Sequence, residues 1–127
     1  MAEAIFNFLA KKTETKAKAK SAGLYVTNKK VEQKARDALK PWGIVIRHKP
    51  TKITRDMFCD ADLVLTMTAE QKLLLEREIK SEKLFSIAEF TDGIDISDPY
   101  GMELEEYLNT AKLLEFSIKN ILTKLKR

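Results

Sequence analysis

Residues 61–67 read ADLVLTM, and this stretch decides the fold class. Leu63, Val64 and Leu65 are consecutive apolar residues, which is typical of a strand buried on both faces of a parallel sheet. Directly after it, Thr68 and Gln71 have the spacing of a capping box, which predicts a helix that runs to about residue 80. Apolar residues at 84–87 then predict a second short strand.

The segments on either side continue this alternation of helices and strands. The predicted elements are a helix at 2–12, a strand at 16–24, a helix at 31–39 stopped by Pro41, a short extended piece at 44–46, a helical turn at 53–58 and a long amphipathic helix at about 104–125. This order indicates an α/β class with a doubly wound parallel sheet flanked by helices. A length of 127 residues, 44% of them apolar, fits a single domain over 1–127.

Composition narrows the possible functions. One cysteine and one histidine exclude an intrachain disulfide and a His/Cys metal cluster, and we expect no metal and no cofactor. No apolar run is long enough for a membrane span and no signal-peptide layout is present, so we expect a cytoplasmic protein without a membrane partner. The net charge is +4. The lysines between 11 and 20 have no aromatic or arginine neighbours, so they indicate a solvated strand edge and no nucleic-acid partner.

Asp98-Pro99-Tyr100-Gly101 is the tetrapeptide that best fits a chemical role. Asp, Pro and Gly at these positions predict a type I turn, and taken alone a turn without catalytic function is the favoured interpretation. Pro99 also pushes Asp98 into an extended conformation. The Asp98 carboxylate would then project from a fixed loop after the last strand, where a general acid of an α/β enzyme is expected.

Several segments read together resemble a known family. MAEAIF at 1–6, SAGL at 21–24, Gly43-Ile44 followed by His48, ADLVLTM at 61–67 and DPYG at 98–101 resemble, in order, the low-molecular-weight protein tyrosine phosphatases. The resemblance covers nearly the whole chain. It implies a parallel sheet flanked by helices and a phosphomonoesterase that hydrolyses phosphotyrosine through a cysteinyl-phosphate. The implied partner is a phosphotyrosine protein or a small aryl phosphate.

The resemblance also implies roles for individual residues. Asp98 matches the general acid of the family, and Tyr100 matches an aromatic residue that lines the substrate cleft. The backbone amides of Met1 and Ala2 match the helix end that faces the phosphate. Tyr25 or Trp42 would supply the opposite aromatic wall, and His48 is expected to be a hydrogen-bonded structural residue.

The sequence departs from the family in its catalytic loop. Members carry a first strand and a Cys-x5-Arg phosphate loop directly before the MAEAIF helix, so the chain is expected to be truncated at its N-terminus relative to the family. Cys59 does not replace the loop, because the sixth residue after it is Leu65 rather than Arg. We expect Cys59 to be an ordinary partly buried cysteine, and the chain as given to be inactive.

Three alternatives to a tyrosine phosphatase stay open at this point. The first is a non-catalytic binding or assembly module, which would form a homodimer through exposed sheet edges. The others are a protein-arginine phosphatase and a relative of the arsenate reductases, which share the fold. A single cysteine argues against arsenate reduction, which relays electrons through further cysteines.

Overall fold

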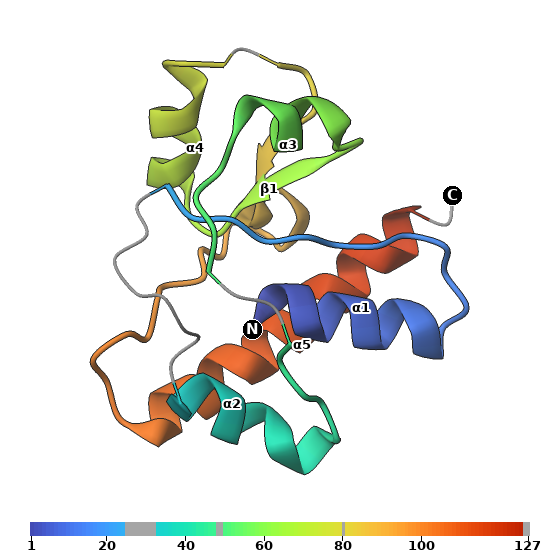
Figure 1. Cartoon of the computed structure of the whole chain (residues 1–127), viewed down its shortest axis with the longest axis vertical. Coiled ribbons are helices and arrows are strands. Elements are labelled where there is room, and N and C mark those ends of the chain that lie inside the picture. The colour runs from blue at the N-terminus through green and yellow to red at the C-terminus, as the bar shows by residue number, and fades with distance from the viewer. Residues whose placement is uncertain (25–32, 48–49, 80, 126–127) are drawn as a thin grey trace.

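The computed structural model describes residues 1–24, 33–47, 50–79 and 81–125. In these ranges the elements, in chain order, are α1 (Ala2–Lys12), α2 (Gln33–Leu39), the 3-10 helix η1 (Lys40–Trp42), α3 (Arg55–Asp60), β1 (Val64–Thr66), α4 (Ala69–Glu76), β2 (Leu84–Ser86), the 3-10 helix η2 (Ile87–Phe90) and α5 (Leu104–Leu125). Figure 1 shows α3, α4 and β1 in one half of the molecule and α1, α2 and α5 in the other. None of the helices in the described ranges has the length and apolar character that a membrane span requires.

The β-α-β unit predicted from residues 61–67 is confirmed. β1 and β2 are parallel, with Val64 opposite Leu84, and α4 connects them. α4 begins in the predicted capping box, where Thr68 Oγ1 accepts from the Gln71 N–H at 3.1 Å and Gln71 Oε1 accepts from the Thr68 N–H at 3.3 Å. It ends at Glu76, earlier than predicted, and residue 80 lies outside the described ranges.

Side chains of the sheet pack against helices on both faces. Val64 and Leu84 form one apolar cluster with Phe58 of α3 and Leu75 of α4. Leu65, the neighbour of Val64, packs against a larger cluster formed mainly by α1, α2 and α5. Successive side chains of a strand point to opposite faces, so each face of the sheet is covered by helices. The predicted helix-flanked parallel α/β class is therefore confirmed.

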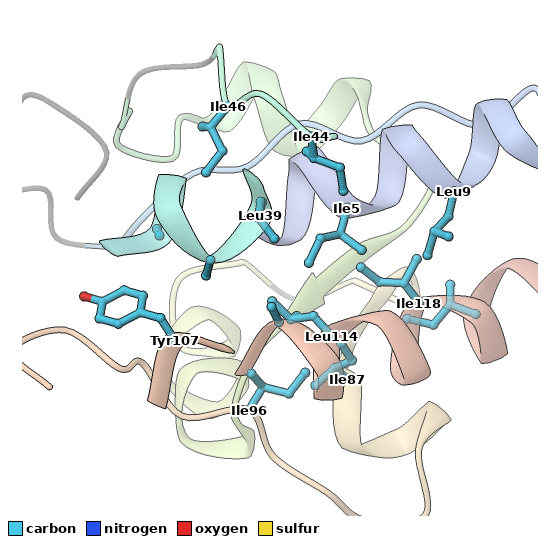
Figure 2. Close-up of a cluster of buried hydrophobic side chains, with 14 of the residues drawn as sticks. Ile5, Leu9, Leu39, Ile44, Ile46, Ile87, Ile96, Tyr107, Leu114 and Ile118 are labelled. Atoms are coloured by element: carbon cyan, nitrogen blue, oxygen red, sulfur yellow. The ribbon is translucent and has the colours of Figure 1, made fainter. Parts of the chain in front are cut away.

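The main core lies between α1 and α5. Ile5 and Leu9 of α1 point toward Leu114 and Ile118 of α5 (Figure 2), and each of these side chains is at most 5% exposed. Spacings of three or four residues place the apolar side chains of each helix on one face. The helices predicted at 2–12 and at about 104–125 are confirmed by this packing.

The strand predicted over 16–24 is wrong. The segment is extended, and its lysines are exposed while the alanines between them are half-buried. Its strand pairing in the described structure is a single parallel bridge between Gly23 and Lys52. A side chain of α1 takes the place of a neighbouring strand, because Asn7 bonds both the N–H and the C=O of Ala19. The alternation of residue types therefore predicted an extended backbone correctly, but the paired strand that it also predicted does not form.

β1 differs from its prediction in burial. Val64, Leu65 and Thr66 are each half-buried rather than fully buried. The sheet in the described ranges has two strands, so β1 has a neighbouring strand along one edge. An edge strand keeps part of its surface accessible even when helices cover both of its faces.

The region between α2 and α3 follows its sequence signals with small shifts. Pro41 ends α2, but the chain continues in η1, because proline is tolerated in the first turn of a helix. Gly43 then closes η1 with a φ of 72°, a conformation that favours glycine. The short extended piece at 44–46 forms no strand, although Ile44 and Ile46 are buried and Val45 is exposed. The helical turn predicted at 53–58 is present as α3.

Candidate functional site

Asp98 lies on a loop that is anchored at the carboxyl end of β1. The N–H of Ile96 donates to the C=O of Met67, directly after β1, at 2.8 Å, and the Ile96 side chain is buried. The carboxylate of Asp95 accepts from the N–H of Ala69 in the first turn of α4 at 3.1 Å. Both anchors hold the loop beyond the carboxyl end of the strand, where ligand sites of α/β domains form.

The turn at Asp98 differs in register from the predicted type I turn over 98–101. The N–H of Met102 donates to the C=O of Pro99 at 2.9 Å, so the backbone turn spans Pro99–Met102. Gly101 has a φ of 82° at its third position, which is typical of a type II turn. Asp98 stands before this turn and accepts from the N–H of Tyr100 at 3.0 Å, which fixes the carboxylate without burying it.

The first turn of α1 lies within the electrostatic reach of Asp98. Met1 and Ala2 are half-buried, and no side chain caps this helix end. Burial lowers the pKa of the Met1 amino group, while the carboxylates of Glu3 and Asp98 act in the opposite direction. The structure thus places the Asp98 carboxylate within electrostatic reach of the helix end at which Met1 and Ala2 lie. The N–H groups of a helix N-terminus favour anions.

Glu3 joins the segment at 21–24 to this end of α1. Its Oε1 accepts from the N–H of Ser21 at 2.6 Å and from the Ser21 hydroxyl at 3.2 Å. Sequence reasoning missed this contact, although both residues lie in segments that carry the family resemblance. The available signal was an acidic residue in the first turn of a predicted helix, a position that favours hydrogen bonds to nearby N–H groups.

Tyr100 presents its ring to solvent beside Asp98. The residue is 61% exposed, so the ring is free to contact a ligand. The loop behind it is held to α2 by Lys34, whose Nζ donates to the C=O of Met102 at 2.7 Å. The sequence contains no signal for this contact, which joins residues 68 positions apart.

The other residues singled out from the sequence are Trp42, Tyr25, His48 and Cys59. Trp42 is half-buried and packs against the main core. Tyr25 and His48 lie outside the described residues. Cys59 is exposed, contrary to the prediction of partial burial, because α3 turns Phe58 toward the core and the next residue along a helix points about 100° away.

No group of three or more His, Cys, Asp or Glu side chains in the described ranges is arranged to hold a metal ion. The described site places the Asp98 carboxylate within electrostatic reach of the N-terminus of α1.

Comparisons with known proteins find similar phosphatases along the whole length of this chain. The model of a family described as "Low molecular weight phosphotyrosine protein phosphatase" matches residues 1–127. A protein-arginine-phosphatase of Bacillus subtilis is 30% identical over 132 residues, which cover 100% of this chain and 88% of that protein.

Two solved structures are similar in fold and sequence. A low molecular weight protein tyrosine phosphatase from T. tengcongensis is 35% identical with a TM-score of 0.88, covering 97% of this chain and 88% of its own. A mutant of YwlE from Bacillus subtilis is 29% identical with a TM-score of 0.92, covering 99% of this chain and 88% of its own.

Proposed function

Because the chain belongs to the low molecular weight phosphotyrosine protein phosphatase family, we propose that it serves in the hydrolysis of phosphorylated protein side chains, with Asp98 as the general acid. The observation that carries this proposal is the anchored Asp98 loop, which stands beyond the carboxyl end of β1 and beside the first turn of α1. A phosphate held at that helix end would have a proton donor next to its leaving group.

The proposed chemistry uses Asp98 twice. A thiolate of a Cys-x5-Arg loop attacks phosphorus, and Asp98 donates its proton to the departing atom of the substrate as the bond to phosphorus breaks. The resulting carboxylate then accepts a proton from the water that cleaves the cysteinyl-phosphate, which releases inorganic phosphate and restores the acid. In this scheme Arg of the same loop binds the phosphoryl oxygens in a bidentate manner.

Phosphoarginine is the substrate that we propose first. Two curated relatives, from Bacillus subtilis and Geobacillus stearothermophilus, are named protein-arginine-phosphatases and are 30% and 32% identical to this chain. Phosphotyrosine is the second candidate. It is supported by the exposed ring of Tyr100, which could stack on a phenyl group, and by the similarity to the T. tengcongensis tyrosine phosphatase.

The 127 residues on their own are expected to be inactive toward either substrate. Their one cysteine, Cys59, is exposed on α3 and has Leu65 where the loop needs Arg. The test compares this polypeptide with one in which a first strand and a Cys-x5-Arg loop, as the family resemblance implies them, are joined before Met1. We expect release of phosphate only from the extended protein. Activity in the 127-residue chain would overturn the assignment of the nucleophile.

The protein extended by the first strand and the loop is also used to distinguish phosphoarginine from phosphotyrosine as the substrate. Hydrolysis rates are measured on one peptide that carries either phosphoarginine or phosphotyrosine at the same position. A higher kcat/KM for phosphoarginine supports the first candidate. A higher value for phosphotyrosine, lowered by Tyr100→Ala but not by Met102→Ala, supports the second. Met102 is the matched control because it is 52% exposed in the same loop.

A non-catalytic assembly module is the competing function. Its support is β1, which is half-buried and has a neighbouring strand along one edge in the described ranges. An edge strand presents unpaired backbone groups to which another chain can add. A stable dimer in sedimentation would favour this function, and a monomer would count against it.

A further inference from the structure

The loop that carries Asp98 is joined to α2 by a side chain from a distant part of the sequence. The Nζ of Lys34 donates to the C=O of Met102 at 2.7 Å, across 68 positions of the chain. Hydrogen bonds of charged donors are shorter and stronger than those between neutral groups. Lys34 is also half-buried, although it is a lysine. The contact is therefore a short, charge-assisted hydrogen bond between two elements.

α2 is a firm support for this bond. Its residues Ala35, Ala38 and Leu39 are at most 6% exposed and belong to the main core. The helix packs against α5, beside which it lies in Figure 1. Arg36 ties α2 to the chain that follows it, because its Nη1 donates to the C=O of Ile46 at 2.7 Å. Lys34 thus extends from a helix whose position the core fixes.

The bond from Lys34 reaches Asp98 through one backbone turn. The N–H of Met102 donates to the C=O of Pro99 at 2.9 Å, so both backbone groups of Met102 are engaged. The N–H of Tyr100, inside the same turn, donates to the Asp98 carboxylate at 3.0 Å. Pro99 is buried, whereas Tyr100 and Met102 are exposed. Packing therefore holds the start of the turn, and Lys34 holds its end.

We propose that Lys34 is a positioning residue for the general acid Asp98, because it fixes the turn whose N–H orients the carboxylate. In this role it acts through the backbone and transfers no proton itself. The effect on rate rests on the proposed phosphatase function, whereas the effect on the turn does not. An error of about 1 Å in the placement of a reacting group can lower a rate about 10²-fold. Release of the turn would thus slow the step in which Asp98 donates its proton.

A role in stability alone is the alternative for Lys34, and the two roles have different kinetic signatures. Loss of stability lowers the folded fraction of the enzyme and so reduces the rate with every substrate by the same factor. A misplaced general acid slows only those reactions whose leaving group needs a proton in the transition state. The dependence of the loss on the leaving group therefore distinguishes positioning from stability.

The first experiment measures hydrolysis of aryl phosphates by variants of the extended protein. Lys34→Met keeps the length of the side chain but removes the donor. We expect it to lower kcat about tenfold for phenols of high pKa and less than about twofold for those of low pKa, with KM nearly unchanged. Lys34→Arg restores a donor and should regain most of this loss.

The matched control is Lys40→Met. Lys40 follows α2 directly and pairs with Asp37 at 3.5 Å on the surface, so its loss should leave the rates at the wild-type level. An equal loss for every phenol in Lys34→Met, a higher KM with unchanged kcat, or no recovery in Lys34→Arg would each overturn the proposal.

The second experiment needs no activity and uses the 127-residue chain. Amide hydrogen exchange, measured by NMR, reports on the N–H of Met102, which is bonded within the turn. We expect this amide to exchange several-fold faster in Lys34→Met, while the amide of Ile118 in the buried part of α5 stays as protected as in the wild type. Unchanged exchange at Met102 would overturn the proposal. If the extended wild type were inactive, the proposed function would fail, but faster exchange at Met102 would still support Lys34 as the residue that fixes the Asp98 turn.

Discussion

Asp98 shows how single hydrogen bonds define the candidate site at the scale of the residue. Its position follows from the bonds of Ile96 and Asp95 to the β1–α4 connection, and its orientation follows from the N–H of Tyr100. The tetrapeptide at 98–101 revealed the loop, because Asp, Pro and Gly have strong local preferences. It could not reveal Lys34, since no local rule links that side chain to a carbonyl 68 residues away.

Glu89 gives a residue-scale prediction about pH. Its pKa is lowered from an ordinary value of 4.5, first by the backbone N–H of Ser86 and then by Lys72. A lowered pKa in the folded state contributes stability above the ordinary value, and this contribution is lost as pH falls through the folded pKa. We therefore expect Glu89→Gln to lower the urea midpoint at pH 7, with a difference from the wild type that shrinks toward pH 3.

The control for this prediction is Glu115→Gln on α5. Glu115 lies 3.8 Å from Lys119 on an exposed helix surface, where ion pairs contribute little. Its effect on the urea midpoint should be smaller than that of Glu89→Gln at pH 7. A Glu89→Gln difference that stays constant between pH 7 and pH 3 would contradict the prediction.

At the scale of the element, signals that lie within one segment predicted well. α1 and α5 follow from helical periodicity, and α4 follows from its capping box. The segment at 16–24 shows the limit of such signals. Its alternation dictates an extended chain, but a ladder also needs a neighbouring strand, and the partner of Ala19 is instead Asn7 on α1. The burial of β1 likewise depends on which strands and helices lie next to it, and its own sequence does not determine this.

The capping box of α4 leads to a prediction about this element. Thr68→Ala removes the hydroxyl that accepts from the Gln71 N–H, and loss of an N-cap side chain costs about 1 kcal/mol. Urea unfolding should show this decrease in the free energy of unfolding. Thr123→Ala, on the exposed surface of α5, is the matched control and should change stability by less than about 0.5 kcal/mol. Equal effects of the two variants would show that the capping box does not stabilise the fold.

At the scale of the whole molecule, the contact of α1 with α5 supports both the core and the site. Ile5 is fully buried in this contact, one turn after Met1, so the position of the helix end depends on it. The strong similarity to the Bacillus subtilis and T. tengcongensis structures concerns this arrangement of helices around the sheet. It could be inferred from the order of the segments, whereas the detailed contacts required the structure.

Ile5→Ala tests the importance of this contact for stability. Removing a fully buried Ile side chain leaves a cavity, and such changes cost about 2–5 kcal/mol. Phe116→Ala on α5 is the control, because that side chain is 53% exposed and its loss should have a much smaller effect. Calorimetry or urea unfolding distinguishes the two. A small loss for Ile5→Ala would mean that α1 is not held by the core that the structure shows.

The most direct test of the proposed catalytic role is the dependence of rate on the leaving group. The substrates are aryl phosphates whose phenol leaving groups have increasing pKa. Their hydrolysis is measured with the extended protein and with its Asp98→Asn variant. Asn keeps an acceptor for the Tyr100 N–H but cannot donate a carboxylic proton. We predict that Asp98→Asn lowers kcat by about 10²- to 10⁴-fold for the poorest leaving groups and far less for the best ones. An equal loss for every phenol, or no loss, would contradict the assignment of Asp98 as the general acid.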